Sequence, residues 1–531
     1  MNDIRGLLMR WQFWALELQA LLLAASTLIE GPRLIRSLRL PTKVIFAALA
    51  PACLAWTLAA GMAPRTSRIL FDEQIYQGVA QNLSDLHLAQ MCNDGTVEYG
   101  RLQCWRGEYN KEPNGYPYLL SVAYRVFGVS DRAAFRLNNA ACAVSAALTV
   151  VLSMLLFDDL AAAAFAGLVF ALIPIQLVWS NTAAVEPSAA MAAELAVLAA
   201  VWWARARTRG ALVWLVAAVA FASTFRPESI LVLPLAAFAI ALLHPRSLAA
   251  SRTWMAGLAA IVLSMPTTWL HLWSVRSESW GSGGSRFALS FLRLNLPVNL
   301  GFYFTGDRFP ILFTFLAIAG LLAVRRWRES VLVAAYLVLF WGVFLVFYAG
   351  SYEYGADVRY SLMSYAPIAI FAGAGASAFA AFASRWTAGR TGRPIAAIAA
   401  LIVVQFLLYA PLVRATGEEA WAARADVDYA KDFARTLPAN AIVLTQTPSM
   451  FHIWGINAAQ LSIAAGDPAY VQHLRARYSG GVFLHWGFWC NVSDETQVAF
   501  CRQTLERFDH ELVVERRVRD YRYALYRLKL P

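Results

Sequence analysis

Charged residues are scarce in this sequence. They make up 15% of the 531 residues, while 59% are hydrophobic and the mean hydropathy is +0.50. Soluble domains carry about 25% charged and about 45–50% apolar residues. The shortage of charge therefore excludes an ordinary soluble domain and indicates an integral membrane protein.

Nucleotide-binding and metal-binding motifs are also missing. The sequence contains no Gly-rich phosphate loop and no dinucleotide motif, so we do not expect a bound nucleotide. The spacing of the four histidines in the tail, His452, His473, His485 and His510, is not typical of a zinc site. We expect no metal and no required cofactor, with a site of His87 and nearby carboxylates as the weaker alternative.

Lysine is rare, because only Lys43, Lys111, Lys431 and Lys529 contribute to the 45 basic residues. The richness in arginine and alanine is typical of a GC-rich bacterial genome. A net charge of +11 does not indicate nucleic-acid binding here, since the arginines cluster between hydrophobic segments. The positive-inside rule predicts that placement for cytoplasmic loops of a membrane protein.

Apolar runs predict a polytopic, mainly helical membrane domain over residues 43–413. A bilayer requires roughly 20 apolar residues per helix, which gives about eleven spans. They lie near 43–63, 133–156, 161–180, 185–204, 211–225, 228–243, 254–274, 309–324, 330–348, 361–383 and 394–413. Residues 1–42 are predicted to form an amphipathic helix on the inner interface, with a twelfth span as the weaker choice.

The arginines also predict the orientation of the spans. Alternate connections carry Arg clusters, such as those at 205–209 and 325–328, and these belong inside. The loop 64–132, the connections 275–308 and 349–360, and the tail from 414 then face outward. We therefore expect a bacterial inner-membrane protein with its long loops in the periplasm.

The six cysteines divide in agreement with this topology. Cys92 and Cys104 fall in the first outward loop, and Cys490 and Cys501 fall in the outward tail, while Cys53 and Cys142 lie in predicted spans. Disulfides form in oxidising compartments. We predict the pairs Cys92–Cys104 and Cys490–Cys501.

The tail, residues 414–531, has the pattern of a small α/β domain. Helices are predicted at "DYAKDFARTL", "DPAYVQHLRARY" and "DETQVAFCRQTLERF". Strands are predicted at "AIVLT" and "GGVFLHW", and two more within "HELVVERRVRDYRYALYRLKL". Such alternation of helices with short apolar strands favours an α/β fold in the periplasm.

Polar chemistry gathers in the first outward loop. In "FDEQIYQGVAQNL", Asp72 and Tyr76 share one face of a helix, while Glu73 points elsewhere. Carboxylates at a helix start also favour the macrodipole, so a purely structural role is the alternative. Further along, Lys111 stands in "NKEP", where an interfacial lysine is the alternative to an anion-binding one.

Other outward connections hold further candidates. Glu186 precedes Pro187 at the start of a span, where a helix N-terminal carboxylate is the alternative role. Arg226 and Arg359 are cations on the same predicted side, although Arg226 has Glu228 as a nearby partner and Arg359 has Asp357.

Four stretches together resemble a known family. "FDEQIYQGVAQNL", "NKEPNGYPYLLSVAYRVFG", "FRLNNA" and "GADVRYSLMSYAP" are similar to motifs of GT-C glycosyltransferases that use polyprenyl-phosphate sugars. The branch compared is that of the lipid A aminoarabinose transferases and protein O-mannosyltransferases. The chain departs from the aminoarabinose transferases at Ile75, where they tend to carry a basic residue, and at Glu112, which replaces the first residue of a Pro pair. These departures leave the donor sugar and the acceptor open.

The resemblance implies transfer of a sugar from a polyprenyl-phosphate donor to a hydroxyl of a cell-envelope glycan, lipid or protein, with inversion. Asp72 is predicted as the base and Glu186 as a second, supporting carboxylate. Predicted to bind donor or acceptor are Glu73, Tyr76, Lys111, Arg226, Arg359 and Tyr360. A lipid-linked saccharide flippase and an O-antigen polymerase or ligase are the alternative functions.

Overall fold

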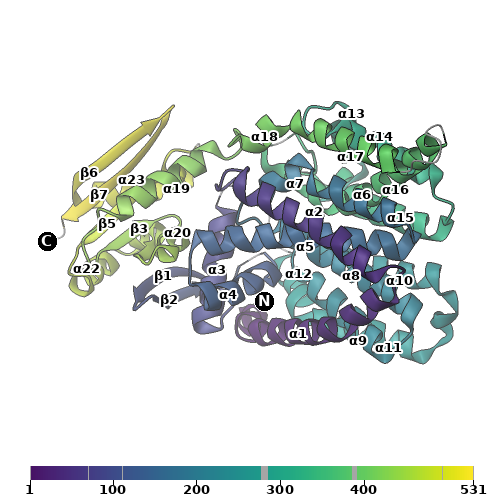
Figure 1. Cartoon of the computed structure of the whole chain (residues 1–531). Coiled ribbons are helices and arrows are strands. Elements are labelled where there is room, and N and C mark those ends of the chain that lie inside the picture. Colours follow the sequence, from purple (N-terminus) through teal and green to yellow (C-terminus); the bar gives the residue numbers. More distant parts are fainter. Residues whose placement is uncertain are drawn as a thin grey trace. The chain divides into compact units, whose positions relative to one another are not determined.

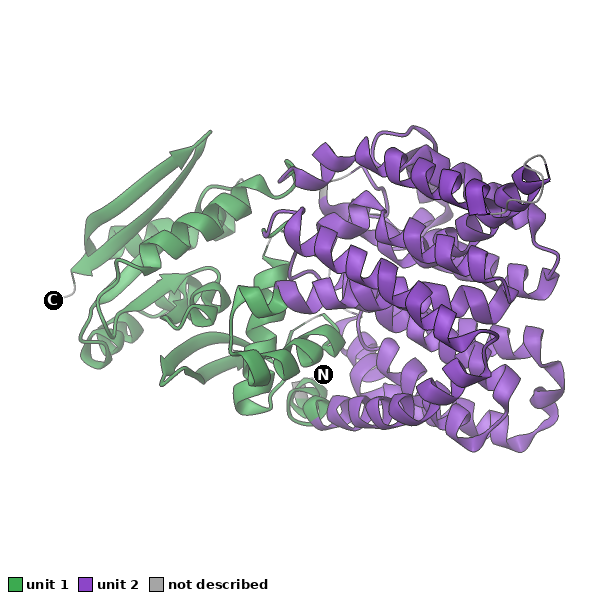
Figure 2. Cartoon of the chain, in the orientation of Figure 1, with its two compact units in different colours: residues 1–13, 66–134, 417–531 green, residues 14–65, 135–416 purple. Residues whose placement is uncertain are grey.

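The computed structural model describes residues 2–69, 71–110, 112–276, 285–353, 355–385, 392–492 and 494–529. It is 71% helical, and its elements are labelled in Figure 1. The chain forms two compact units, coloured separately in Figure 2. Unit 1 comprises Met1–Phe13, Thr66–Ala134 and Gly417–Pro531, and unit 2 comprises Trp14–Arg65 and Phe135–Thr416. The domain boundaries predicted at 42 and 413 stay predictions.

Unit 2 is built from helices that form at the apolar runs of the sequence. Two helices extend into both units, namely α1 (Asn2–Ser37) and α5 (Asp131–Phe157). The other helices are α2 (Pro41–Gly61), α6 (Leu160–Ala171), α7 (Pro174–Trp179), α8 (Glu186–Ala206), α9 (Arg209–Ala222), α10 (Val232–Leu243), α11 (Ser251–Ser264), α12 (Leu270–Val275), α13 (Leu292–Phe304), α14 (Ile311–Ala323), α15 (Trp327–Leu345), α16 (Tyr365–Ser384), α17 (Gly392–Leu407) and α18 (Ala410–Arg414). Short helical turns include η1 (Pro227–Leu231) and η5 (Gly355–Ser364).

Within the described residues, seven helical segments are long and apolar enough to cross a membrane. They are Asp3–Ser37, Pro41–Gly61, Asp131–Phe157, Glu186–Ala206, Ser251–Val275, Trp327–Leu345 and Ala356–Ser384, and five shorter apolar helices accompany them. The chain is thus a multi-pass membrane protein. The predicted count of eleven spans is not confirmed, and the role of residues 1–42 stays a prediction.

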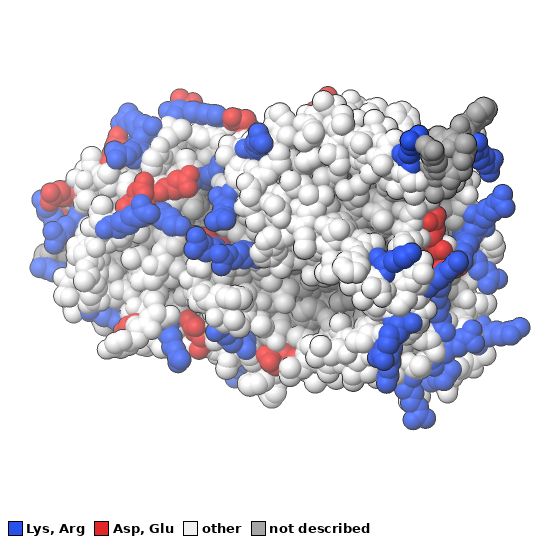
Figure 3. All heavy atoms as spheres, in the orientation of Figure 1, with Lys and Arg blue, Asp and Glu red and all other residues white. Residues whose placement is uncertain are grey.

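One face of unit 2 has a charge distribution that suits a bilayer. On the face drawn in Figure 3, a broad area of unit 2 carries no charged side chains, and Lys and Arg side chains gather at one end of the unit. Arg39, Arg205 and Arg326 line one cavity of unit 2. These residues come from three connections that were all predicted to face the cytoplasm, so the connections converge as the arginine pattern requires.

Close helix packing in unit 2 depends on glycine. At Gly320 on α14, an added Cβ would overlap the carbonyl oxygen of Phe371 on α16, and at Gly375 on α16 it would overlap the carbonyl oxygen of Leu316 on α14. The two helices therefore approach through reciprocal glycines, as small residues permit in membranes where apolar burial against lipid gives little driving force.

Unit 1 contains a seven-stranded sheet in the order β2-β1-β4-β3-β5-β7-β6. The strands are β1 (Met91–Glu98), β2 (Arg101–Glu108), β3 (Ile442–Thr445), β4 (Asn457–Gln460), β5 (Val482–Trp486), β6 (Asp509–Val518) and β7 (Tyr521–Lys529). The helical elements are α3 (Asp72–Leu86), α4 (Gly115–Phe127), α19 (Trp421–Ala434), α20 (Pro448–Ile453), α21 (Leu461–Gly466), α22 (Pro468–Arg477), η6 (Phe488–Cys490) and α23 (Glu495–Arg507). The helices and strands predicted for the tail are present.

The centre of this sheet is parallel and buried on both faces. β3 pairs in parallel with β4 and β5, whereas the other pairings are antiparallel. Alternate residues of β3 enter different cores: Ile442 and Leu444 pack with α21, α22 and α23, and Val443 packs with α19 and α20. Apolar runs such as "AIVLT" are typical of strands with two covered faces.

Residues 64–132, the first loop predicted to face outward, contribute two strands of this sheet, which the sequence did not predict. β1 and β2 form a hairpin, and β1 pairs with β4 through Asp94 opposite Ala459 and Gly95 opposite Ala458. Residues 91–108 thus share a sheet with the tail. Residues Thr66–Ala134 and the tail from Gly417 accordingly fall in the same compact unit.

Both predicted disulfides are present. Cys92–Cys104 links β1 to β2, and Cys490–Cys501 links η6 to α23. Cys53 and Cys142 are free. The pairing follows the predicted division between outward segments and spans, which confirms the disulfide prediction itself.

Candidate active site

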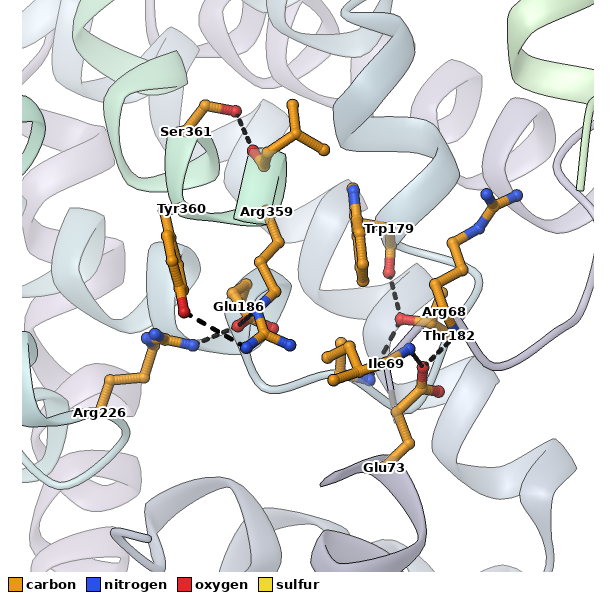
Figure 4. Close-up of polar contacts among 12 residues, drawn as sticks. Arg68, Ile69, Glu73, Trp179, Thr182, Glu186, Arg226, Arg359, Tyr360 and Ser361 are labelled. Atoms are coloured by element: carbon orange, nitrogen blue, oxygen red, sulfur yellow. Dashed lines mark hydrogen bonds and ion pairs between the residues drawn. The ribbon is translucent and has the colours of Figure 1, made fainter. Parts of the chain in front are cut away.

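Three connections of unit 2 converge on the carboxylate of Glu186 (Figure 4). Arg359 Nε lies 3.0 Å from Glu186 Oε1, and Arg226 Nη1 donates a hydrogen bond to the same oxygen. Arg226 Nε also donates to Glu228 Oε1. The segments at 186, 226–228 and 359 were each predicted to face outward, and the fold brings them to one point.

The site is largely withdrawn from solvent. Glu186 is 1% exposed, and the side chains of Arg226 and Arg359 are 11% and 10% exposed. Burial lowers the pKa of Arg226, but the carboxylates of Glu228 and Glu186 raise it by more, so its pKa lies above the ordinary value. Arg226 is therefore held as a cation beside Glu186.

The ring of Tyr360 lies against both guanidiniums. Its ring stacks on Phe344 with centroids 4.5 Å apart. The Cζ atoms of Arg226 and Arg359 lie 5.1 and 5.2 Å from the Tyr360 ring centroid, within the range of cation–π attraction. Two cations and a tyrosine thus form a compact, preorganised group that can face an anion.

The connection before Glu186 is held by the "FRLNNA" motif on α5. Asn138 Nδ2 donates to the carbonyls of Thr182 at 2.8 Å and Ala184 at 2.7 Å. Ser188 Oγ donates in turn to Asn138 Oδ1 at 2.8 Å. Because Asn138 satisfies the buried carbonyls directly before α8, it fixes where Glu186 begins that helix.

A second pair of asparagines supports the connection that leads to Arg359. Asn295 Nδ2 on α13 donates to the carbonyls of Phe344 and Phe347 at 3.0 and 2.8 Å. One helical turn later, Asn299 donates to the Gly350 carbonyl at 2.8 Å. Sequence reasoning missed both, although two asparagines four residues apart in a predicted outward segment are the signal that would have indicated them.

Glu73 has a clear local role in unit 1. Its buried Oε1 accepts hydrogen bonds from the backbone N–H groups of Arg68 at 2.6 Å and Ile69 at 3.2 Å. The guanidinium of Arg68 pairs with Glu419. Glu73 thereby fixes the turn that precedes α3, as a carboxylate in a first helical turn often does.

The other predicted residues of the first loop lie in unit 1 as well. Asp72 is the first residue of α3 and is half-buried. Tyr76 is buried, and its ring meets that of Tyr116 edge-on with centroids 5.9 Å apart. Lys111 lies outside the described residues. The structure thus brings Glu186, Arg226, Arg359 and Tyr360 together, and it places Asp72, Glu73 and Tyr76 on one helix of the other unit.

Within the ranges that the structure describes, no group of three or more His, Cys, Asp or Glu is placed to hold a metal ion. Within the membrane domain, Glu194 on α8 is buried and accepts a hydrogen bond from Thr149 Oγ1 at 2.7 Å. The candidate site is therefore the paired-arginine group around Glu186, in a multi-pass membrane protein.

Comparisons with known proteins agree with this class. No family model and no curated protein sequence matches the chain. Among solved structures, ArnT from Cupriavidus metallidurans bound to undecaprenyl phosphate is similar, with a TM-score of 0.54 and 16% identity over 91% of this chain and 97% of that one. The apo structure of the same protein gives a TM-score of 0.54 and 15% identity over 92% and 98% of the two chains.

The mycobacterial arabinofuranosyltransferase AftD is similar over 93% of this chain and 40% of its own, with 12% identity and a TM-score of 0.47. ArnT, the lipid A aminoarabinose transferase, is a GT-C fold glycosyltransferase. The present chain has the GT-C fold, which confirms the fold predicted from the four motifs.

Proposed function

We propose that the chain is an integral membrane glycosyltransferase of the bacterial inner membrane. In this proposal it moves a sugar from a polyprenyl-phosphate donor to an acceptor hydroxyl on the periplasmic side. The observation that carries the proposal is the pair of buried guanidiniums, Arg226 and Arg359, held on Glu186 within a GT-C fold. A polyprenyl phosphate as ligand is supported by the similar ArnT structure, which contains undecaprenyl phosphate.

The reaction requires three groups. The acceptor oxygen bonds to the anomeric carbon while the bond from that carbon to the phosphate oxygen breaks, and the electron pair leaves with the polyprenyl phosphate. Arg226 and Arg359 would stabilise the negative charge that develops on this phosphate. Asp72 would accept the acceptor proton, for which it must lie within about 3 Å of the acceptor oxygen. Direct displacement would invert the anomeric centre.

Glu186 is proposed as a positioning residue. Its Oε1 is already shared by two guanidiniums, so its contribution is to hold both cations in one orientation before the donor binds. Such preorganisation is what makes electrostatic stabilisation effective in a site from which water is excluded. Tyr360 would complete the group by fixing the planes of the guanidiniums.

The test is a carrier-release assay with the purified protein in lipid nanodiscs. Undecaprenyl phosphate carrying mannose, glucose, galactose or aminoarabinose is supplied with a bacterial envelope extract, and free undecaprenyl phosphate is measured by mass spectrometry. We expect release that depends on the protein and on an acceptor and that is lost in Arg359→Ala. Movement of intact donor across a bilayer would instead indicate a flippase, and lengthening of the carrier-linked glycan would indicate a polymerase. Either result would contradict the proposal.

A further inference from the structure

Unit 1 contains a cavity of about 320 Å³ that none of the predicted roles uses. Gln446 and Thr447, which directly follow β3, line it, together with Gln460 at the end of β4 and Trp489 just after β5. Gln497 on α23 closes another side. Thr447 is buried and the other four are half-buried, so four of the five residues are partly exposed.

The position of this cavity is one that favours ligand binding. It lies at the carboxyl ends of the three parallel strands of the sheet. The chain passes from β3 to its neighbour β4 and then to β5 on the opposite side of β3. In open α/β sheets, ligands bind at the carboxyl ends of the strands where the strand order changes direction in this way.

The lining chemistry selects an uncharged, hydroxyl-rich ligand. Gln460 Nε2 donates to Gln446 Oε1 at 3.1 Å, and Gln446 Nε2 donates to the Gln497 carbonyl at 3.2 Å. These two bonds fix the orientation of the Gln446 amide, and Gln497 lines the same cavity. Amide and hydroxyl side chains can each donate and accept hydrogen bonds. A sugar hydroxyl also does both, so it can pair with these groups in either role.

The remaining lining sharpens this selection. The hydroxyl residues Ser449 and Ser462 border the cavity, and Asn93 Nδ2 there donates to Glu108 Oε2 at 2.7 Å. Among the described lining residues none is Lys or Arg, so an anionic group such as a phosphate has no counter-charge. Trp489 also lines the cavity, and an indole is a large apolar group that can cover the C–H side of a sugar.

Both disulfides fix walls of the cavity. Cys92 stands between the lining residues Met91 and Asn93, and Cys490 directly follows Trp489. Its partner Cys501 lies one helical turn after Gln497 on α23. One disulfide thus cross-links the wall from residues 91–108, and the other cross-links the wall from the tail. Rigid walls reduce the entropy lost when a ligand binds.

A series of buried polar contacts holds the segment that precedes Trp489. Asp426 Oδ2 on α19 accepts a hydrogen bond from the Phe488 backbone N–H at 2.9 Å, and Asp426 Oδ1 lies 3.0 Å from His485 Nε2. His485 Nδ1 is 3.2 Å from Thr445 Oγ1 at the end of β3. The backbone at Phe488, directly before Trp489, is therefore tied through Asp426 and His485 to β5 and β3.

We propose that this cavity binds an uncharged sugar unit of the acceptor, which makes the acceptor a glycan. The inference rests on the proposed function, because Phe71 and Ile75 line the cavity and the proposed base Asp72 lies in the same first turn of α3. A glycan seated here has its hydroxyls beside the helical turn that carries the base.

Binding is tested apart from transfer, on the full chain in detergent micelles. Saturation-transfer NMR is recorded with the methyl glycosides of glucose, galactose, mannose, arabinose and N-acetylglucosamine, and inorganic phosphate is added as a competitor. We expect at least one glycoside to bind and phosphate not to displace it. Gln497→Ala should weaken binding by about tenfold, since it removes an amide but keeps the carbonyl that Gln446 uses. Trp489→Phe, which retains an aromatic core contact, should also weaken binding.

Gln503→Ala is the matched control, because Gln503 is exposed on the same helix α23 and lies outside the cavity. Glycoside binding that is equal in Gln497→Ala, Trp489→Phe and Gln503→Ala, displacement by phosphate, or no binding of any glycoside would overturn the inference. Glycoside binding that depends on Gln497, combined with no release of carrier from any donor, would leave this site standing and reject the transferase function instead.

Discussion

Arg359 and Glu186 meet through Nε and Oε1 at 3.0 Å, and that same carboxylate oxygen accepts a hydrogen bond from Arg226. One buried carboxylate therefore aligns two guanidiniums that come from separate connections of the membrane domain. Two roles in this arrangement can be tested independently. The planar guanidinium of Arg359 would act on the donor, and the charge of Glu186 holds that guanidinium in place.

Arg359→Lys is expected to reduce the rate of sugar transfer by about 100-fold, because a lysine keeps the charge but loses the planar fork and its stacking on Tyr360. The measurement is carrier release at saturating donor. Arg293→Lys on α13 is the control, since Arg293 is exposed and the same exchange there should leave the rate unchanged. Equal rates in the two variants would contradict a role of Arg359 at the phosphate.

Glu186→Gln is expected to lower the free energy of unfolding by about 3 kcal/mol, because two buried guanidiniums lose a shared counter-charge. Glu228→Gln should lower the free energy of unfolding by clearly less, since Glu228 pairs with Arg226 alone and its side chain is 10% exposed. Thermal unfolding followed by tryptophan fluorescence in one detergent compares the two. A larger loss in Glu228→Gln would show that Glu186 does not organise the pair.

Asp72 and Glu73 are adjacent, yet their substitutions should act on different quantities. Asp72→Asn is expected to lower turnover by about 10²–10⁴-fold with little change in stability, as removal of a general base does. Glu73→Gln is expected to lower the free energy of unfolding by about 1–3 kcal/mol, because two backbone N–H groups lose a charged acceptor.

The two variants serve as controls for each other. Turnover and the unfolding midpoint are measured on the same preparations, with residual turnover in Glu73→Gln corrected for the folded fraction. A well-folded Asp72→Asn protein with full turnover would exclude Asp72 as the base. Loss of stability in Asp72→Asn alone would indicate that the two residues have the opposite roles.

Helices and strands of this chain could be predicted from the sequence where the signal is local. Runs of about 20 apolar residues predict spans without reference to the rest of the chain, and "AIVLT" has the composition of a buried strand. The pairing of β1 with β4 was not predictable in this way, because it joins segments far apart in sequence and β4 reads "NAAQ", which lacks β-branched residues. Such pairings are determined by tertiary contacts rather than by propensity.

The site shows the same limit. The side of the membrane predicted for Arg226, Arg359 and Glu186 followed from arginine placement, and the fold brings all three together. That one carboxylate serves both cations depends on side-chain geometry, which no spacing encodes. Glu73 was equally ambiguous, because helix starts favour carboxylates whether or not they act chemically.

Gly320→Ala is expected to lower the free energy of unfolding by about 1–3 kcal/mol, since the new methyl would overlap the Phe371 carbonyl where α14 and α16 meet. Gly342→Ala on α15 is the matched control, because nothing lies within 4 Å of its added Cβ. Alanine there should stabilise its helix by up to about 1 kcal/mol. Unfolding midpoints in the same detergent give both values, and equal effects would rule out the close glycine contact.

His452 on α20 makes unit 1 sensitive to acid. Burial lowers the pKa of His452 to about 4, although hydrogen bonds to the carbonyls of Ala458 and Gly95 raise it in part. The unfolded chain binds this proton below the usual pKa of 6.5, and the folded chain does so only near 4. The contribution of His452 to the free energy of unfolding is therefore fully present above its pKa in the unfolded chain. It falls as the pH drops toward its pKa in the folded chain, with about 2 kcal/mol lost by about pH 5.

His452→Gln should remove this part of the acid dependence, which is measured as the change in unfolding midpoint between about pH 7.5 and pH 5 relative to the parent chain. Burial raises the pKa of Asp85 and Asp94, which gives the opposite slope at low pH, but both residues are present in each protein and cancel in the difference. His510→Gln, at an exposed position on β6, should keep the full acid dependence. An unchanged slope in His452→Gln would assign the acid sensitivity to other groups, because the variant no longer contains the buried imidazole that takes up the proton.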